Sequence, residues 1–203
     1  MSKWSEIYRK QMSDFASLDD FIEGKLAYKR KLIDVIQKYG SNHRTLLEAG
    51  SGSGVTSIWL AKQGYFVIGI DSDPDMISLS RSIASDQKTS VDFRQDDIRT
   101  LSSISDRFDV IFSNGVMEHF SDEEIVSIVN KHLSMSDSVI ISVPSDYFSD
   151  EQRLHGDERF MRVEAWRKIL AGCTGRIVEE FSFDSNMPVG LKPQFIGFVL
   201  KSS

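Results

Sequence analysis

The residues with the clearest chemical potential form a loop in which glycine and serine alternate. Gly50, Gly52 and Gly54 follow an acid, Glu48, and Ser51 lies between the first two glycines. Glycine lets the backbone turn sharply and approach a ligand closely, and the N–H groups of a following helix would point to the same place. The pattern predicts a ligand-binding loop, or a tight strand–helix turn that binds nothing.

Two acids stand where the next strands are expected to end. Asp71 closes an apolar run. A carboxylate there suits the two ribose hydroxyls of an adenosine, or it caps the helix that Pro74 opens. Asp97 is followed by Ile98, so the acid could accept from an adenine amino group while the apolar neighbour packs on the ring. The competing interpretation of Asp97 is an exposed surface acid.

Residues 108–120 start as a buried strand and open into polar residues. Ligands of open α/β sheets bind at the carboxyl edge of the strands, near the point where the strand order reverses. Asn114, Glu118 and His119 are therefore expected to face a site. Imidazole as a class titrates near neutrality, which makes His119 the candidate general base, or else a wall residue that orders the pocket.

The elements that must position these residues alternate between strand and helix. The strands are too apolar to have a wet face, so they are buried on both sides, as in a parallel sheet covered by helices. The last two strands are expected to form an antiparallel hairpin with a long connection. Strands are expected over residues 45–47, 66–70, 91–93, 108–112, 139–143, 176–183 and 195–200, and helices over residues 4–15, 17–40, 55–63, 74–83, 123–133 and 164–170.

Composition limits the function classes. The chain has 203 residues and a formal net charge of -6. This size fits one domain, and the acidity counts against nucleic acid, whose phosphates need a basic face. No apolar run reaches the length of a membrane span and the N-terminus has no signal-peptide pattern, so a cytoplasmic protein without membrane contact is expected. The single cysteine, Cys173, excludes an intramolecular disulfide.

Together these motifs resemble those of the class I S-adenosylmethionine-dependent methyltransferases. Residues 46–54 are similar to that family's first motif, residues 67–71 to its second, and residues 108–120 to its strand-four motif, which usually ends in Glu-His and an apolar residue. The resemblance implies a Rossmann-like, doubly wound α/β fold: a mostly parallel seven-stranded sheet with an antiparallel last strand and helices on both faces. It implies S-adenosyl-L-methionine as cofactor, held by Glu48, Gly50, Ser51, Gly52, Gly54, Asp71, Ser72, Met76, Asp97, Ile98, Asn114 and Gly115.

The sequence lacks the motifs of several other branches of this family, which limits the reactions that can be expected. Residues 113–116 lack the Pro-Pro-aromatic pattern of the nucleic-acid amino-methylating branch, and no Pro-Cys pair exists for methylation of cytosine C5. No acidic metal site of the catechol type can be assembled either. The resemblance therefore implies metal-free, in-line methyl transfer to O, N or C of a small molecule.

Two alternatives stay open at this point. One is a non-catalytic cofactor-binding or regulatory protein, since fold alone does not establish catalysis. The other is a nucleotide-dependent oxidoreductase, which Val55 disfavours because the third glycine of dinucleotide loops normally stands at that position.

A single domain over residues 1–203 is expected to have four parts. Residues 1–40 form a helical cap, residues 45–145 the cofactor-binding core, and residues 164–203 a helix plus the C-terminal hairpin. Residues 146–163 form a substrate lid or a solvated connection, because their mixture of aromatic and charged side chains suits substrate contact. The predicted lid residues are Tyr147, Arg153, His155 and Arg159, together with Tyr8 of the cap.

Overall fold

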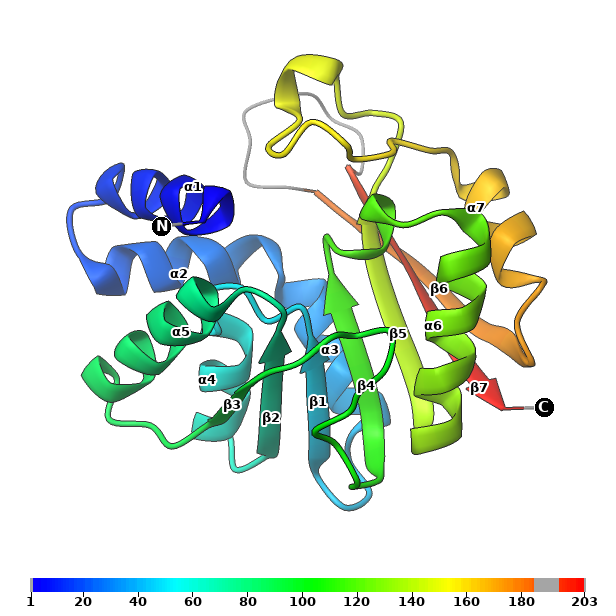
Figure 1. The fold of residues 1–203 in the computed structure, drawn as a ribbon, viewed down its shortest axis with the longest axis horizontal. Coiled ribbons are helices and arrows are strands. Elements are labelled where there is room, and N and C mark those ends of the chain that lie inside the picture. The colour runs from blue at the N-terminus through cyan, green and yellow to red at the C-terminus, as the bar shows by residue number, and fades with distance from the viewer. Residues whose placement is uncertain (1, 185–193, 203) are drawn as a thin grey trace.

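A seven-stranded sheet runs through the centre of the molecule (Figure 1). The computed structural model describes residues 2–184 and 194–202, so most of the predicted hairpin connection lies outside the described residues. Six strands run parallel, and β7 lies antiparallel between β5 and β6, which confirms the predicted sheet. In spatial order the strands are β3 (Asp92–Gln95), β2 (Phe66–Asp71), β1 (Thr45–Ala49), β4 (Phe108–Asn114), β5 (Ser136–Pro144), β7 (Phe195–Ser202) and β6 (Gly175–Phe183).

Alternation along the central strands produces two layers of core. Leu46 and Val110 join a cluster on one face, Leu47 and Ile111 join a cluster on the other, and all four are fully buried. This follows because neighbouring residues of a strand point to opposite faces. The first cluster contains residues of α3 (Arg30–Tyr39) and α4 (Val55–Lys62), and the second contains residues of α6 (Asp122–Met135) and α7 (Val163–Leu170). Within the described ranges, no helix has both the length and the apolar content needed to cross a membrane.

The N-terminal helices differ from the prediction at one point. Instead of one helix over residues 17–40, the chain forms α2 (Leu18–Tyr28) and α3, which meet at Lys29. Lys29 has a ψ of 3°, outside helical geometry. The element α2 packs on α4, whereas α3 packs on β4 and β5. One straight apolar stripe cannot face a helix and a sheet in different directions, so the helix breaks where its packing partner changes.

The first helix, α1 (Lys3–Ser13), is tied to the start of α5 (Pro74–Asp86). Ser2 caps α1 by accepting a hydrogen bond from the N–H of Ser5, and its own hydroxyl donates to Asp73. The backbone N–H of Ser2 donates to Oδ2 of Asp75 at 2.6 Å. As a result, α1 and α2 lie at the same end of the sheet as the loops that follow the carboxyl ends of the strands (Figure 1).

His132, on α6, provides a test of this packing. It is 1% exposed, and its Nε2–H donates to the backbone oxygen of Ile98 at 2.9 Å. Burial lowers the pKa of His132 to about 4, so between about pH 6.5 and pH 4 the unfolded chain takes up a proton that the folded chain does not. The free energy of unfolding should therefore fall as the pH falls, by about 2 kcal/mol from this residue between about pH 7 and pH 5.

Urea denaturation at these two pH values measures the loss. His132→Gln keeps a hydrogen-bond donor but does not titrate. Its free energy of unfolding should therefore fall by about 2 kcal/mol less than that of the wild type between these two pH values. His43→Gln, at an exposed position, should behave like the wild type. An unchanged pH dependence in His132→Gln would contradict this account of the α6 core.

Candidate active site

A cavity of about 220 Å³ opens at the carboxyl edge of the sheet, where β1 and β4 end. These strands are neighbours, but the helices that follow them, α4 and α6, cover opposite faces of the sheet. This is the crevice in which open α/β sheets bind ligands. The predicted cofactor residues on its wall are Gly50, Gly52, Asp71, Ser72, Met76, Asp97, Ile98, Asn114 and Gly115.

Hydrogen bonds to the end of β2 fix the glycine loop. The N–H groups of Gly50 and Ser51 both donate to the backbone oxygen of Ile70, at 2.9 and 2.8 Å, and the N–H of Gly52 donates to Oδ2 of Asp71 at 2.9 Å. Gly50 and Gly52 have φ values of 77° and 53°, a left-handed backbone that favours glycine. The loop is therefore held rigidly at the cavity.

Three predicted cofactor residues, Glu48, Ser51 and Gly54, do not line the cavity. Glu48 is 3% exposed and accepts hydrogen bonds from the backbone N–H and the hydroxyl of Ser57, at 3.1 and 2.5 Å. Burial raises the pKa of Glu48. A Cβ at Gly54 would collide with the ring of Phe93. Glu48 on β1 therefore points into the core, Ser51 is 7% exposed, and Gly54 lies against Phe93, so none of the three reaches the cavity.

The two predicted ligand acids have different surroundings. Asp71 accepts hydrogen bonds from the N–H groups of Gly52 and Asp73, and burial raises its pKa. Asp97 forms an ion pair with Arg99 at 2.6 Å, and hydrogen bonds from Arg99 lower the pKa of Asp97. Arg99 also lines the cavity. Sequence reasoning missed it, because nothing in its spacing separates it from a surface arginine.

The end of β4 places two polar side chains at the cavities. Oδ1 of Asn114 accepts from the hydroxyl of Ser142 at 2.7 Å, so the carbonyl oxygen of the amide is held and the amide N–H groups are left for a ligand. Glu118 is 3% exposed, and its Oε2 has no hydrogen-bond partner among the described residues. Burial raises the pKa of Glu118 to about 8, so this carboxyl is mostly protonated at neutral pH.

A second cavity of about 130 Å³ adjoins the first. The residues common to both walls are Trp4, Tyr8, Asn114, Gly115 and His119. The second wall also contains Gln11, Lys25, Tyr28, Glu118, Pro144, Phe148, Gln152, Leu154, Glu158, Phe160 and Phe195. Gln11, Lys25 and Tyr28 were not expected, because their helices are far in sequence from every motif and only the fold brings them here.

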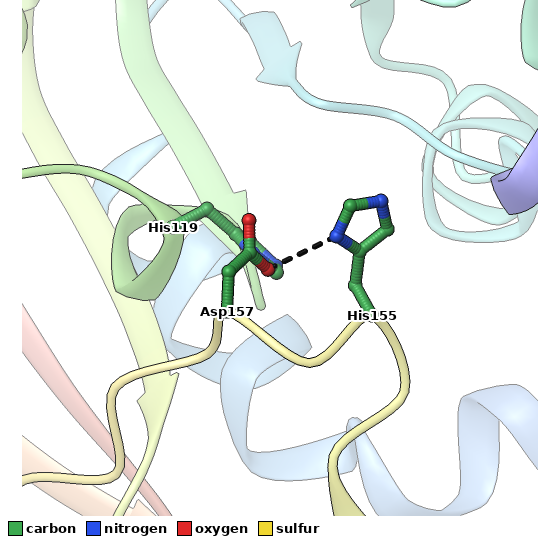
Figure 2. Close-up of side chains that lie close together, drawn as sticks. All are labelled: His119, His155 and Asp157. Atoms are coloured by element: carbon green, nitrogen blue, oxygen red, sulfur yellow. Dashed lines mark hydrogen bonds and ion pairs between the residues drawn. The ribbon is translucent and has the colours of Figure 1, made fainter.

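His119 takes part in a small polar cluster at the rim. Its Nδ1 lies 2.7 Å from Oδ1 of Asp157, and Nδ1 of His155 lies 3.1 Å from the same oxygen (Figure 2). Trp4 stacks on His155, with ring centroids 5.1 Å apart. One ligand atom from each of His119, His155 and Asp157 lies within 4.8 Å of the others, a spacing that could hold a metal ion. The expectation of no metal therefore stays a prediction.

The segment over residues 146–163 lines part of the second cavity, but the side chains that do so are not the predicted ones. Tyr147 is 50% exposed. Arg153 pairs with Asp150, and Arg159 pairs with Asp122 at 2.7 Å. Neither these residues nor His155 lines either cavity, whereas Phe148, Gln152, Leu154, Glu158 and Phe160 line the second one. Phe148, Phe160 and the backbone-bonded Glu158 thus line the second cavity, whereas Arg153 lies on the Phe160 ring and Arg159 pairs with Asp122 away from both cavities.

Comparison with known proteins agrees with this geometry. Residues 46–135 match the family model described as a methyltransferase domain. This segment is therefore similar to a methyltransferase domain. The ubiquinone biosynthesis O-methyltransferase of Azorhizobium caulinodans is 30% identical over 106 residues, which cover 48% of this chain and 41% of that protein. The same-named protein of Sinorhizobium fredii is 27% identical over 127 residues, 59% of this chain and 50% of that protein. The chain therefore spans half or less of the length of these relatives.

Solved structures resemble the whole described chain. Magnesium protoporphyrin IX methyltransferase from Synechocystis PCC 6803 has a TM-score of 0.71 at 17% identity, with 98% of this chain and 94% of that chain covered. An S-adenosylmethionine-dependent methyltransferase from Clostridium acetobutylicum has a TM-score of 0.71 at 15% identity, with 99% and 98% covered. Such low identities show the fold alone. They confirm the predicted Rossmann-like class I fold.

Trp4→Ala should loosen the rim of the second cavity. Trp4 stacks on His155, and Nζ of Lys3 donates to the backbone oxygen of His155 at 2.6 Å. Loss of the indole removes the first of these contacts, so amide exchange over residues 153–158 should become about tenfold faster in hydrogen–deuterium exchange. Phe15→Ala, whose ring contacts Phe21 instead, is the control. Wild-type exchange rates in Trp4→Ala would mean that α1 does not hold this segment.

Proposed function

We propose that this chain is a methyltransferase that transfers the methyl group of S-adenosyl-L-methionine to O, N or C of a small molecule. The observation that carries the proposal is the pair of adjoining cavities at the carboxyl edge of the sheet, one with the glycine loop and acids and the other with aromatic walls. The match to a methyltransferase domain and the relatives named O-methyltransferases support it.

The first cavity suits the two ends of this cofactor. Asp71 would bind the ribose hydroxyls, because its carboxylate is fixed by two backbone N–H groups at the end of β2. Met76 and Ile98, both buried, would pack on the adenine ring. The amide of Asn114 would donate to the methionyl carboxylate. When bound, the cofactor supplies an activated methyl group on a positively charged sulfur.

The chain itself must align the acceptor, exclude water and remove a proton. Alignment of the acceptor with the S–CH₃ bond contributes on the order of several kcal/mol to lowering the barrier. As the acceptor atom bonds to the methyl carbon, the electron pair of the broken bond stays on sulfur, and an O–H or N–H acceptor gives up its proton. His119 lines both cavities, and its Nδ1–H donates to Asp157, which leaves Nε2 to take that proton.

Gly52→Ala tests the cofactor site. The new Cβ would lie 2.7 Å from the hydroxyl of Tyr8, at a φ of 53° that disfavours alanine. The Kd for S-adenosyl-L-methionine, measured by calorimetry, should rise at least about tenfold. Gly64→Ala is the matched control, because Gly64 has a φ of 84° and no atom closer than 3.7 Å to a Cβ. It should lose about 1 kcal/mol of stability without a change in Kd.

Parallel calorimetry with NAD separates the methyltransferase from an oxidoreductase. Binding of S-adenosyl-L-methionine without NAD is the expected result, and the reverse would overturn the proposal. Transfer of label from methyl-labelled S-adenosyl-L-methionine into small molecules of a cell extract then separates an enzyme from a binding protein. Cofactor binding without any transfer of label would favour the regulatory alternative.

His119→Ala tests the proton-removal step. If His119 accepts the proton, the turnover number measured with the extract-derived acceptor should fall by about 10²–10⁴-fold, and the rise of rate with pH should disappear. His43→Ala, at an exposed position away from both cavities, should keep wild-type turnover. Retained turnover with an unchanged pH–rate profile in His119→Ala would remove the base role.

A further inference from the structure

On the wall of the second cavity, a carboxyl oxygen of Glu118 forms no hydrogen bond with any described residue. Oε2 of Glu118 is buried and accepts and donates no hydrogen bond there, although Glu118 is 3% exposed. A buried polar atom without a hydrogen-bond partner is costly. A polar ligand group that forms a hydrogen bond with Glu118 would remove this cost.

Lys25 brings a positive charge to the same cavity. Its Nζ donates to Oε1 of Gln11 at 2.6 Å and lies 5.3 Å from the centre of the Tyr8 ring. Burial and then the neighbouring Lys29 lower the pKa of Lys25 to about 8, and no carboxylate of the described residues acts on it. The ammonium is still the main form at pH 7, and a charge withdrawn from water, as in this half-buried side chain, is stabilised by pairing with an opposite charge. The site therefore favours an anion.

The other charges on this wall already have partners. Oε1 of Glu158 accepts from the N–H groups of Leu154 and His155 at 2.9 and 2.6 Å, and Oε2 accepts from that of Gly156 at 2.7 Å. His119 is bonded to Asp157. Glu158 is thus held by neutral backbone N–H groups, whereas the hydrogen-bond partner of the Lys25 ammonium is the neutral amide of Gln11.

Aromatic rings line much of the cavity. Tyr28, Phe195 and Phe148 lie in a row, with ring centroids 6.2 Å apart for the first pair and 5.3 Å apart for the second. Phe160 continues this row at 5.3 Å from Phe148. Trp4 and Tyr8 of α1 also line the cavity. A wall rich in aromatic rings favours an aromatic ligand, because ring–ring contacts add to the burial of apolar surface.

We infer that the methyl acceptor is a planar aromatic molecule with an acidic group, which Lys25 binds, and with a polar group that forms a hydrogen bond with Glu118. This inference rests on the proposed function, since it names the acceptor of that reaction. The aromatic walls hold the ring, and Asn114, Gly115 and His119 separate it from the cofactor cavity.

A set of matched probes tests the charge and the ring separately. The probes are the three hydroxybenzoates, the corresponding hydroxybenzamides, and the hydroxycyclohexanecarboxylates. Their affinities are measured by calorimetry with the full chain saturated with S-adenosylhomocysteine, so this readout does not need turnover. The best hydroxybenzoate should bind at least about tenfold more tightly than its amide and its saturated counterpart.

Variants assign the preference to Lys25 and Glu118. Lys25→Met should abolish the preference for the acid over the amide, whereas Lys25→Arg should restore it. Lys62→Met, whose ammonium bonds Gln87 outside both cavities, is the control and should keep it. Glu118→Leu should weaken the binding of both acid and amide by about tenfold, because it removes a hydrogen-bond partner of the ligand and leaves Lys25 in place. Each variant is first compared with the wild type for its melting temperature and for its affinity for the cofactor.

The outcomes separate this inference from the proposed function. Equal affinity for acid, amide and saturated probe, or an unchanged acid preference in folded Lys25→Met, would overturn the inference. So would a labelled product from the extract that has no aromatic ring or no acidic group, and that result would leave the methyltransferase function intact. A labelled aromatic acid would support both. A protein that binds no S-adenosyl-L-methionine would instead refute the proposed function.

Discussion

The carboxylate of Asp71 is the contact on which the rest of the site depends. It accepts the N–H of Gly52, which holds the glycine loop, and the N–H of Asp73, which starts α5. Asp73 in turn caps α5 through the N–H of Asp75 and accepts the hydroxyl of Ser2 at the start of α1. One acid at the end of β2 therefore connects the ligand loop to the helix that covers it.

This connection explains how one edge of the sheet carries two cavities. The sheet places the glycine loop and the end of β4 side by side, and α1, held at Asp73 and Asp75, adds Trp4 and Tyr8 to both walls. Tyr8 is half-buried there, and desolvation raises its pKa, so its hydroxyl stays neutral. The first cavity depends on backbone geometry, whereas the second cavity depends on side chains from distant elements.

This difference between the two cavities also explains which features could be predicted from the sequence. The apolar strands, the glycine loop and Asp71 follow local rules of periodicity and turn geometry, so the sheet and most of the first cavity were predictable. The break at Lys29 was not, because it depends on whether α2 and α3 face a helix or a sheet. Lys25 and Phe195 were not predicted either, because only the packing of α2 and of β7 brings them to the second cavity.

The side chains of the segment over residues 146–163 illustrate a further limit. Arg153 and Arg159 suit substrate contact by type, yet each pairs with an acid, Asp150 and Asp122, and neither lines a cavity. Glu158, an unremarkable acid in the sequence, faces inward because three backbone N–H groups of its own turn surround it. Residue type alone could not decide between these orientations.

A crystal structure of the chain with S-adenosylhomocysteine tests the central claim most directly. The account predicts the ribose hydroxyls within hydrogen-bond distance of Asp71, and the sulfur at the boundary that Asn114, Gly115 and His119 form between the two cavities. A ligand bound elsewhere, or one whose sulfur points away from the second cavity, would contradict it.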